Sequence, residues 1–328
     1  MTAPRNHAWI QTKLHNTTST GNPLHPNIEA SGDYISDKST GSIRLAFQNV
    51  RGTSTGHGLA LPTEIEVIDH YGIDIMGMAE TNRPWSLHQR ATYDAFMTLR
   101  FHSSRTIYTA APALSPLDTY QPGGNLLSIN GHTTGRISGS GSDPWGRFCW
   151  YSLRGRRDEG VIVITAYRVC QEKHNNPGPL TAFQQQYTAL RRNGVTNPNP
   201  RQQILMDICT LITEKRKEGL RPILLIDANG DYLAGKDSGL ASFLHRACLA
   251  DPFHDKFKIA PPTYQYGKQR IDYIFTDPGL APSIQNVGYL GTHSGIFSDH
   301  VMAYMDLDEA SLFAGIINRP PGSTCERF

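Results

Sequence analysis

Acidic, amide, imidazole and phenol side chains stand at or beside the ends of short apolar runs in this 328-residue sequence. Short apolar runs are typical of buried β-strands, and ligands of open α/β sheets bind in the crevice outside strand ends. Side chains separated by about 250 residues can therefore converge on one site. They are Asn49, Glu80, Tyr167, Asp227, Asn229, Asp272, Asp299 and His300.

Two of these acids suit a divalent cation. Carboxylates such as Glu80 and Asp299 are ligands that a hard ion like Mg²⁺ accepts, together with waters. Such an ion neutralises phosphate charge and stabilises a leaving oxygen. The pattern therefore indicates metal-assisted chemistry on a phosphate. Taken alone, however, Glu80 is also typical of a surface acid, and Asp299-His300 of a capping pair.

The remaining polar positions suit proton transfer. Asp227 and Asn229 are two residues apart, so on a strand they point to the same side. A carboxylate that accepts a proton beside an amide that orients water or phosphate can generate a nucleophile. His300 could donate to a phosphoryl oxygen, and Asp272 behind it would hold its tautomer and favour its charged form. The alternative for residues 227–229 is a plain turn.

Arginine dominates the basic residues, with 22 Arg against 9 Lys in a chain of formal net charge +2. Residues 81–157 contain nine Arg, no Lys and three acids, which makes this segment +6 with histidine neutral. The planar guanidinium binds phosphate through two parallel hydrogen bonds, so a phosphate-rich polymer is a natural partner. The alternative is a set of solvated loop charges.

Composition excludes several classes of protein. Hydrophobic residues are 38% and charged residues 18% of the sequence, as in globular proteins and unlike disordered chains. No apolar run approaches the ~20 residues of a membrane-spanning helix, and the N-terminus lacks the apolar region of a secretory signal. The five cysteines are scattered without a C-x-x-C pair, which favours free thiols in a reducing compartment. We expect an intracellular protein, with the nucleus as one option for its location. We expect no membrane partner, and the sequence indicates no protein partner.

Alternating strand and helix patterns position these side chains. Residues 1–41 are polar without apolar periodicity, which predicts a disordered arm. Residues 42–310 alternate without a linker, which predicts one catalytic domain, and 311–328 form a tail. Strands are expected at 42–47, 73–78, 123–129, 148–153, 161–167, 221–227, 270–275 and 301–305, and helices at 62–72, 180–190, 199–219 and 239–248; segments 94–101 and 106–111 are ambiguous.

The joint order of these segments resembles the endonuclease/exonuclease/phosphatase superfamily, the metal-dependent phosphoesterases that include DNase I, abasic-site endonucleases and retrotransposon endonucleases. The resemblance implies an α/β (α+β) fold, a four-layer sandwich of two mixed β-sheets packed face to face and flanked by helices. It also implies Mg²⁺, with Mn²⁺ as a substitute, and in-line hydrolysis of a phosphoester. The matching motifs cover most of residues 42–306 and are FQNVRG (47–52), IDIMGMAET (73–81), GGNLLSI (123–129), VIVITAY (161–167), ILLIDAN (223–229), Thr263-Tyr264 before QRIDYIF (269–275), and SDH (298–300).

The same resemblance implies metal-side and phosphate-side positions. Asn49 and Glu80 look like the metal-side pair, with Glu80 the direct ligand. Asp299 resembles a second metal-side acid. Tyr167 resembles the family tyrosine that contacts the scissile phosphate. Arg168, beside it, is our own candidate for a phosphate clamp, with a solvated strand-end arginine as the alternative.

The chemical step is implied in the same way. Asp227 resembles the residue that activates the attacking water, with Asn229 beside it for phosphate and water. Asp272 and His300 resemble the carboxylate–imidazole pair on the phosphate. The usual Gly-Asp-Phe-Asn reads Ile-Asp-Ala-Asn at 226–229, which keeps both polar positions.

Several functions remain open. The segments TAYRVC (165–170), Gln184–Gln186 and MDLDEASLFAG (305–315) resemble the endonuclease part of non-LTR-type retroelement proteins. The leading hypothesis is therefore a DNA endonuclease that nicks the backbone by in-line attack of water. A small-molecule phosphoesterase of the same fold and a non-catalytic nucleic-acid-binding remnant are alternatives. An abasic-site repair endonuclease is disfavoured, because Asn82 stands where those enzymes tend to carry Lys and residues 50–54 depart from their pattern.

Overall fold

Two β-sheets form the centre of the molecule. The computed structural model describes residues 31–33, 35, 37–53, 62–112, 120–155, 159–172, 181–233, 235, 237–258, 261–292 and 294–313. In this part of the chain, the first sheet has the order β1 (Ser31–Gly32), β11 (Ile284–Leu290), β12 (Met302–Asp308), β2 (Ser42–Asn49), β3 (Ile75–Ala79), β5 (Asn125–Asn130) and β4 (Ser104–Thr109). The second has the order β10 (Asp272–Thr276), β9 (Leu220–Asp227), β8 (Gly160–Tyr167), β7 (Phe148–Arg154) and β6 (Ile137–Ser142). Each sheet is mixed, because β2–β3 and β8–β9 are parallel and their other pairs are antiparallel.

The two sheets pack face to face through one apolar layer. Alternate residues of a strand point to opposite faces, so every second side chain of β2 enters this layer. Ile43, Leu45 and Phe47 are fully buried there and belong to the same core as Ile223 and Leu225 of β9. The layer is the main hydrophobic core, and it fixes how the ends of the two sheets lie relative to each other.

Gly77 of β3 lies where the two sheets approach closely. A Cβ atom at this position would be 2.6 Å from Leu225 Cδ1 and 2.6 Å from Thr165 Oγ1. Both neighbours belong to the opposite sheet, Leu225 on β9 and Thr165 on β8. The missing side chain therefore permits the spacing of the sheets at this point.

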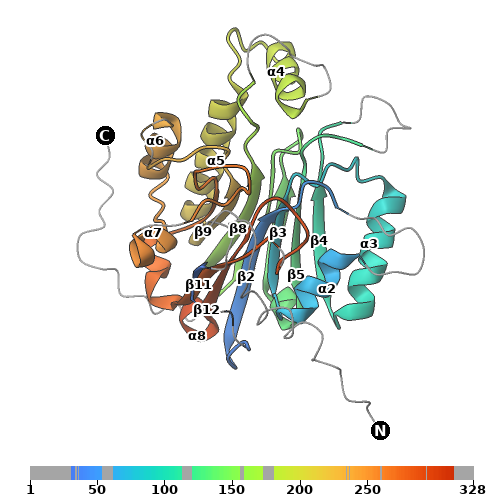
Figure 1. The fold of residues 1–328 in the computed structure, drawn as a ribbon, viewed down its shortest axis with the longest axis vertical. Helices are drawn as coiled ribbons and strands as arrows, with labels where there is room; N and C mark the ends of the chain where they lie inside the picture. Colours follow the sequence, from blue (N-terminus) through green and yellow to red (C-terminus); the bar gives the residue numbers. More distant parts are fainter. Residues whose placement is uncertain are drawn as a thin grey trace, which may run out of the picture.

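Helices cover the outer face of each sheet (Figure 1). Ile208 of α5 and Phe243 of α6 share a core with the five-stranded sheet, and Ile65 of α2 and Tyr93 of α3 share one with the other sheet. The order helix–sheet–sheet–helix confirms the predicted four-layer sandwich. The described helices are α2 (Thr63–His70), α3 (Leu87–Arg100), α4 (Ala182–Arg192), α5 (Pro200–Lys217), α6 (Ser238–Arg246), α7 (Pro252–Phe257) and α8 (Glu309–Phe313), with 3-10 turns at Gly131–Arg136 and Pro278–Ser283.

Local capping signals explain where two of these helices begin. The Asn199 side chain accepts the backbone N–H of Gln202, and Pro200 occupies the first helical position of α5, as predicted. Ser86 and Gln89 form a reciprocal capping box at the start of α3. The capping box explains why the ambiguous segment 94–101 is helical up to residue 100, whereas 106–111 is strand up to residue 109.

Both ends of the described chain join the fold. β1 pairs antiparallel with β11, inside the segment 1–41 for which the sequence predicts a disordered arm. Leu312 and Phe313 of α8 are buried in the main core, at the start of the predicted tail. Residues 1–30 of the arm and 314–328 of the tail lie outside the described residues. Among the helices that are described, none combines the length and the apolar character needed to cross a membrane.

Candidate active site

Strand register brings the polar side chains to one edge of the molecule. Asp227 ends β9 and lies opposite Asp272, the first residue of β10, and opposite Tyr167, the last residue of β8. On the other sheet, Asn49 ends β2 beside the end of the parallel strand β3, which Glu80 follows. The convergence expected at the strand ends is therefore present.

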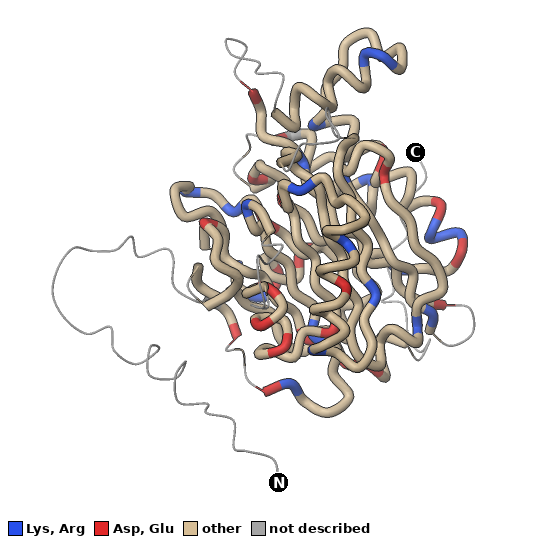
Figure 2. Tube along the Cα trace, turned by 90° about the vertical axis from the view of Figure 1, so that its right-hand side faces the viewer, with Lys and Arg blue, Asp and Glu red and all other residues tan. Residues whose placement is uncertain are grey.

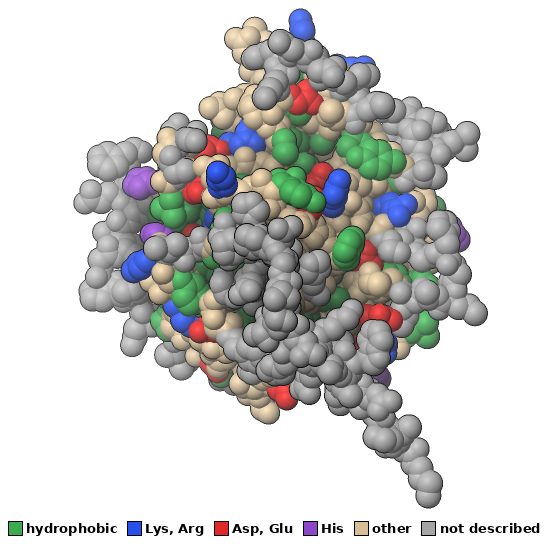
Figure 3. Space-filling view, in the orientation of Figure 1, with side chains coloured by type: hydrophobic (Ala, Val, Ile, Leu, Met, Phe, Trp, Pro, Cys, Tyr) green, Lys and Arg blue, Asp and Glu red, His purple; other side chains and the backbone are tan. Residues whose placement is uncertain are grey.

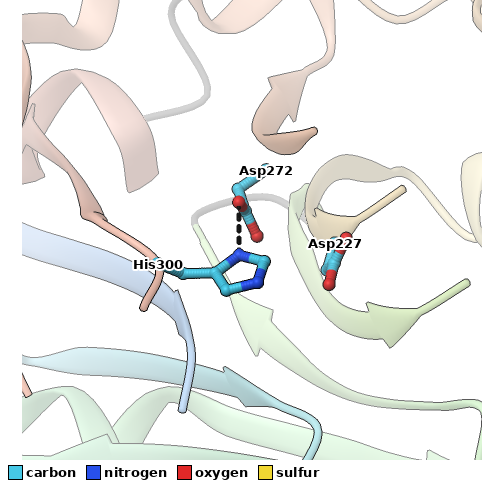
Figure 4. A group of neighbouring side chains, drawn as sticks. All are labelled: Asp227, Asp272 and His300. Carbon is cyan, nitrogen blue, oxygen red and sulfur yellow. Dashed lines mark hydrogen bonds and ion pairs between the residues drawn. The ribbon is translucent and has the colours of Figure 1, made fainter. Parts of the chain in front are cut away.

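Asp227, Asp272 and His300 form the centre of this edge. All three are buried, and one ligand atom from each lies within 4.8 Å of the others. Figure 4 shows the Asp272 carboxylate on one side of the imidazole and Asp227 on another. These residues come from three strand ends or loops that are far apart in the sequence.

Asp272 holds the imidazole of His300. His300 Nδ1 lies 2.8 Å from Asp272 Oδ2. Burial alone would lower the pKa of His300, but the Asp272 carboxylate outweighs it and raises that pKa to about 9. The ring is therefore a cation at neutral pH. In Figure 4 its second nitrogen, Nε2, lies on the side of Asp227, where it can donate a hydrogen bond.

Asp227 is held by two donors. Its Oδ1 accepts the backbone N–H of Asn229 at 2.9 Å, and its Oδ2 accepts the Asn49 side-chain amide at 2.7 Å. Burial, and then repulsion from Asp272, raise the pKa of Asp227 to about 8. A carboxyl group with a pKa close to neutral suits general acid–base chemistry.

The Asn49 amide connects the two sheets. Its Nδ2 donates to Glu80 Oε2 at 2.7 Å as well as to Asp227, while its Oδ1 accepts the backbone N–H of Arg51 at 2.9 Å. Asn49 therefore presents N–H groups to the carboxylates and positions Glu80, instead of offering its oxygen as a ligand. Burial raises the pKa of Glu80 above its ordinary value.

The edge carries more negative than positive charge. Its carboxylates are Glu80, Asp227, Asp272 and Asp299. The cations near them are His300 and Arg51, whose NH1 lies 3.2 Å from Asp299 Oδ2. Asp272 Oδ1 and Asp299 Oδ1 are buried without a hydrogen-bond partner among the described residues. Unpaired carboxylate oxygens beside further carboxylates are a donor set that fits a hard divalent cation.

Tyr167 and Asn229 also lie at this edge. Burial raises the pKa of Tyr167 well above its ordinary value, with the charge of Glu80 next in importance, so the phenol stays protonated. The Asn229 side chain turns toward the loop after β8, because Nδ2 donates to Arg168 O at 2.8 Å and Oδ1 accepts from Cys170 Sγ at 2.9 Å. Asn229 therefore donates a hydrogen bond to Asp227 through its backbone N–H and not through its side chain. The sequence assigned no role to Cys170.

The structure does not bring Arg168 to the phosphate side. Its guanidinium is 3% exposed and pairs with Asp237 Oδ2 at 2.5 Å, and its NH1 donates to Ala228 O at 3.0 Å. Arg201 also pairs with Asp237 at 3.1 Å and donates to Asn229 O at 3.0 Å. We term Arg168, Arg201 and Asp237 the Asp237 cluster; it fixes the backbone behind Asp227, and its arginines are already engaged there. The phosphate clamp expected of Arg168 therefore has no support in the geometry.

A second buried ion pair lies behind Asp272. Arg270 NH1 is 2.5 Å from Asp251 Oδ2, and the guanidinium lies 4.5 Å from the centre of the Tyr273 ring. The Tyr273 hydroxyl donates to Arg270 O at 2.6 Å. These contacts fix the start of β10, which carries Asp272.

Two hydroxyl side chains hold the loops of the site. Thr263 Oγ1 accepts the backbone N–H of Asp272 at 3.0 Å. Ser298 Oγ donates to Asn49 O at 2.7 Å and accepts the backbone N–H of His300 at 3.2 Å. Both residues fall in the motifs that carry the family resemblance, but a hydroxyl that bonds only to backbone has no sequence signature of its role.

Among the described residues of the arginine-rich segment 81–157, some arginines pair with acids from outside the segment. Arg147 is buried and pairs with Asp207 of α5, and Arg136 pairs with Glu309 of α8. Figure 2 shows Lys and Arg interspersed with Asp and Glu over the molecule. Acids outside the segment thus neutralise part of its charge, which leaves fewer free arginines for the phosphate-rich polymer expected as its partner.

Solved structures share this fold. One is the AP endonuclease LMAP from Leishmania major (TM-score 0.55, 14% identity, covering 81% of this chain and 88% of that chain). A second is the 3′ phosphatase NExo from Neisseria bound to a product DNA hairpin (TM-score 0.53, 15% identity, covering 81% of this chain and 99% of that chain). A third is the catalytic domain of human Nocturnin with a bound sulfate (TM-score 0.53, 14% identity, covering 82% of this chain and 95% of that chain).

No protein-family model matches the sequence, and no curated protein matches it. The predicted resemblance is confirmed at the level of the fold, since the chain has the fold of the endonuclease/exonuclease/phosphatase proteins.

Proposed function

We propose that this chain is a divalent-metal-dependent phosphodiesterase that cuts nucleic acid, as a DNA endonuclease using in-line attack of water. The observation that carries the proposal is the convergence of buried Asp227, Asp272 and His300 at one strand edge, with Glu80 on the facing sheet. The fold supports it, because one protein of the same fold is an AP endonuclease and another is bound to a product DNA hairpin.

Mg²⁺, with Mn²⁺ as a substitute, is the cation that the donor set suits. Glu80 and Asp299 would hold it, since both present carboxylate oxygens at the edge and Asp299 Oδ1 is buried without a partner among the described residues. When bound, the cation supplies neutralisation of phosphate charge and stabilisation of the leaving oxygen.

The chain's own residues handle the protons. Asp227, with a pKa of about 8, accepts a proton from the attacking water. The His300 imidazolium donates from Nε2 to a phosphoryl oxygen, while Asp272 holds Nδ1 and stabilises the cation. The protonated phenol of Tyr167 donates a further hydrogen bond to the phosphate.

Nicking of supercoiled plasmid tests the proposal, with Mg²⁺ and with EDTA, for the wild type, Asp227→Asn and His300→Gln. We expect cutting only with the metal, and a loss of about 10³-fold in rate for each variant. The Leu99→Ala variant is the control, because Leu99 is 76% exposed on α3. A wild-type rate of nicking in either variant would contradict the mechanism. Hydrolysis of a soluble phosphomonoester without any cutting of DNA would instead establish the small-molecule phosphoesterase.

A further inference from the structure

Two loops beside the candidate active site expose large aromatic side chains. Tyr266 is 73% exposed and Phe297 is 83% exposed. Their loops are joined by backbone, because Gln265 N–H donates to Asp299 O at 2.7 Å and Tyr264 bridges to His300. We term residues 263–267 and 296–300 the aromatic lip.

Ring contacts connect this lip to the centre of the site. The Tyr264 ring centre lies 5.0 Å from that of His300 and 5.6 Å from that of Tyr266. Only the ring of Tyr264 therefore lies between Tyr266 and the imidazole in this series of contacts. Arg51, which is 69% exposed, pairs with Asp299 of the lip and adds a cation there.

Exposed aromatic rings next to a cation suit one kind of ligand. Such rings stack on nucleobases of any sequence, and nearby Arg side chains attract the phosphate backbone. Figure 3 shows hydrophobic side chains in separate patches on the upper half of one face, with Arg or Lys between them. In a double helix each base stacks between its neighbours, so the faces of the bases are covered. Aromatic rings that project from the lip can therefore stack only on bases that have left such a stack.

We propose that the aromatic lip binds an unstacked base next to the scissile phosphate, with Tyr266 and Phe297 as the stacking surfaces, so that single-stranded nucleic acid is the preferred form of substrate. The inference rests on the proposed function for the position of the phosphate. It names the form of substrate that the function leaves open.

Binding without hydrolysis tests the lip separately from catalysis. Fluorescence anisotropy in EDTA would compare a labelled oligodeoxythymidine strand of about 12 nucleotides with the matched duplex. We expect tighter binding of the single strand, weakened about tenfold by Tyr266→Ala, about tenfold by Phe297→Ala, and further by both together. Leu99→Ala, a matched loss of an exposed apolar side chain on α3, should bind as the wild type does.

Three results would overturn the inference: no binding of the single strand, wild-type affinity in both lip variants, or equal losses for single strand and duplex. Circular dichroism of each variant would show whether a lost affinity reflects unfolding. A chain that binds the strand through the lip but cuts no DNA with Mg²⁺ would refute the proposed function and leave the lip standing.

Discussion

The half of the site on the five-stranded sheet is held by buried ion pairs. The Asp237 cluster lies behind Asp227, and the Arg270–Asp251 pair lies behind Asp272. Arg168 and Arg201 pair with Asp237 and also donate to backbone carbonyl groups, and Arg270 donates to both carboxylate oxygens of Asp251. The strand ends that carry the two central carboxylates are therefore fixed by charge.

The half on the seven-stranded sheet contains strained backbone. Glu80 and Arg51 both have left-handed backbone, with φ of 55° and 48°. The Asn49 amide then connects Glu80 to Asp227 of the other half. Asn229, beside Asp227, also has left-handed backbone, with φ of 45°, so backbone strain occurs in both halves. The difference is that buried ion pairs lie behind the strand ends of the five-stranded sheet, where loss of one charged partner leaves another charge buried.

Among variants that test this comparison, we expect Asp237→Asn to cause the largest losses of stability and activity. It leaves two buried guanidinium groups with a neutral partner, so we expect a loss of about 3 kcal/mol in the free energy of unfolding. Displacement of the backbone behind Asp227 should lower kcat about 10- to 100-fold, with a smaller change in KM. Urea unfolding and steady-state kinetics on a model phosphodiester measure the two effects.

Asp306→Asn is the matched control for that variant. Asp306 pairs with Arg44, which is 2% exposed, and Arg44 lies five residues before Asn49 on β2, away from the strand end. It should lose a similar amount of stability without the fall in kcat. Equal losses of kcat in the two variants would show that the Asp237 cluster has only a general structural role.

The Asp272–His300 pair predicts an intermediate, pH-dependent effect. The pKa of His300 is raised from 6.5 to about 9 in the folded chain. The imidazolium therefore stabilises the fold fully below pH 6.5, and this contribution is lost as the pH rises through 9. In EDTA we expect the free energy of unfolding to fall by on the order of 2 kcal/mol over this range.

His300→Gln isolates that contribution. Asp227, with its pKa raised to about 8, also destabilises the fold as the pH rises, so the variant should retain a shallower slope. Melting temperatures from pH 6 to 9.5 for both proteins measure the difference. Identical slopes would mean that the ion pair does not hold the histidine proton.

Arg51 gives the smallest effect and tests the other half. Arg51→Gly and Arg51→Ala both remove the guanidinium, but only glycine adopts the left-handed conformation without strain. We expect the glycine variant to be more stable than the alanine variant by about 1 kcal/mol in urea unfolding. An alanine variant of equal stability would show that the backbone at this position carries no strain.

Much of the fold was predictable because its signals are local. Apolar runs marked the strands, and the Asn199-Pro200 signal marked the start of α5. The meeting of Asp227, Asp272 and His300 was predictable from motif order, since strand ends that share an edge bring their side chains together.

The rest depended on contacts between distant residues. Arg168 reads as a strand-end cation, and only the fold shows that Asp237 and Arg201 engage it. The net charge of segment 81–157 is a sum over its own residues. In the fold, Glu309 and Asp207 from other parts of the chain neutralise two of its arginines. Sequence spacing carries no information on such pairing, because any acid of the chain can provide it.

Gly77 has a consequence for the distance between the two halves of the candidate site. Asp227, the proposed proton acceptor, and Glu80, the proposed ligand, belong to opposite sheets, so the gap between them depends on how closely the sheets approach. A single methyl group at Gly77 would meet Leu225 Cδ1 and Thr165 Oγ1 at 2.6 Å, so these side chains or the sheets that carry them would have to shift. The spacing of the two halves of the candidate site thus depends in part on the interior of the molecule, through one absent carbon atom remote from the solvent.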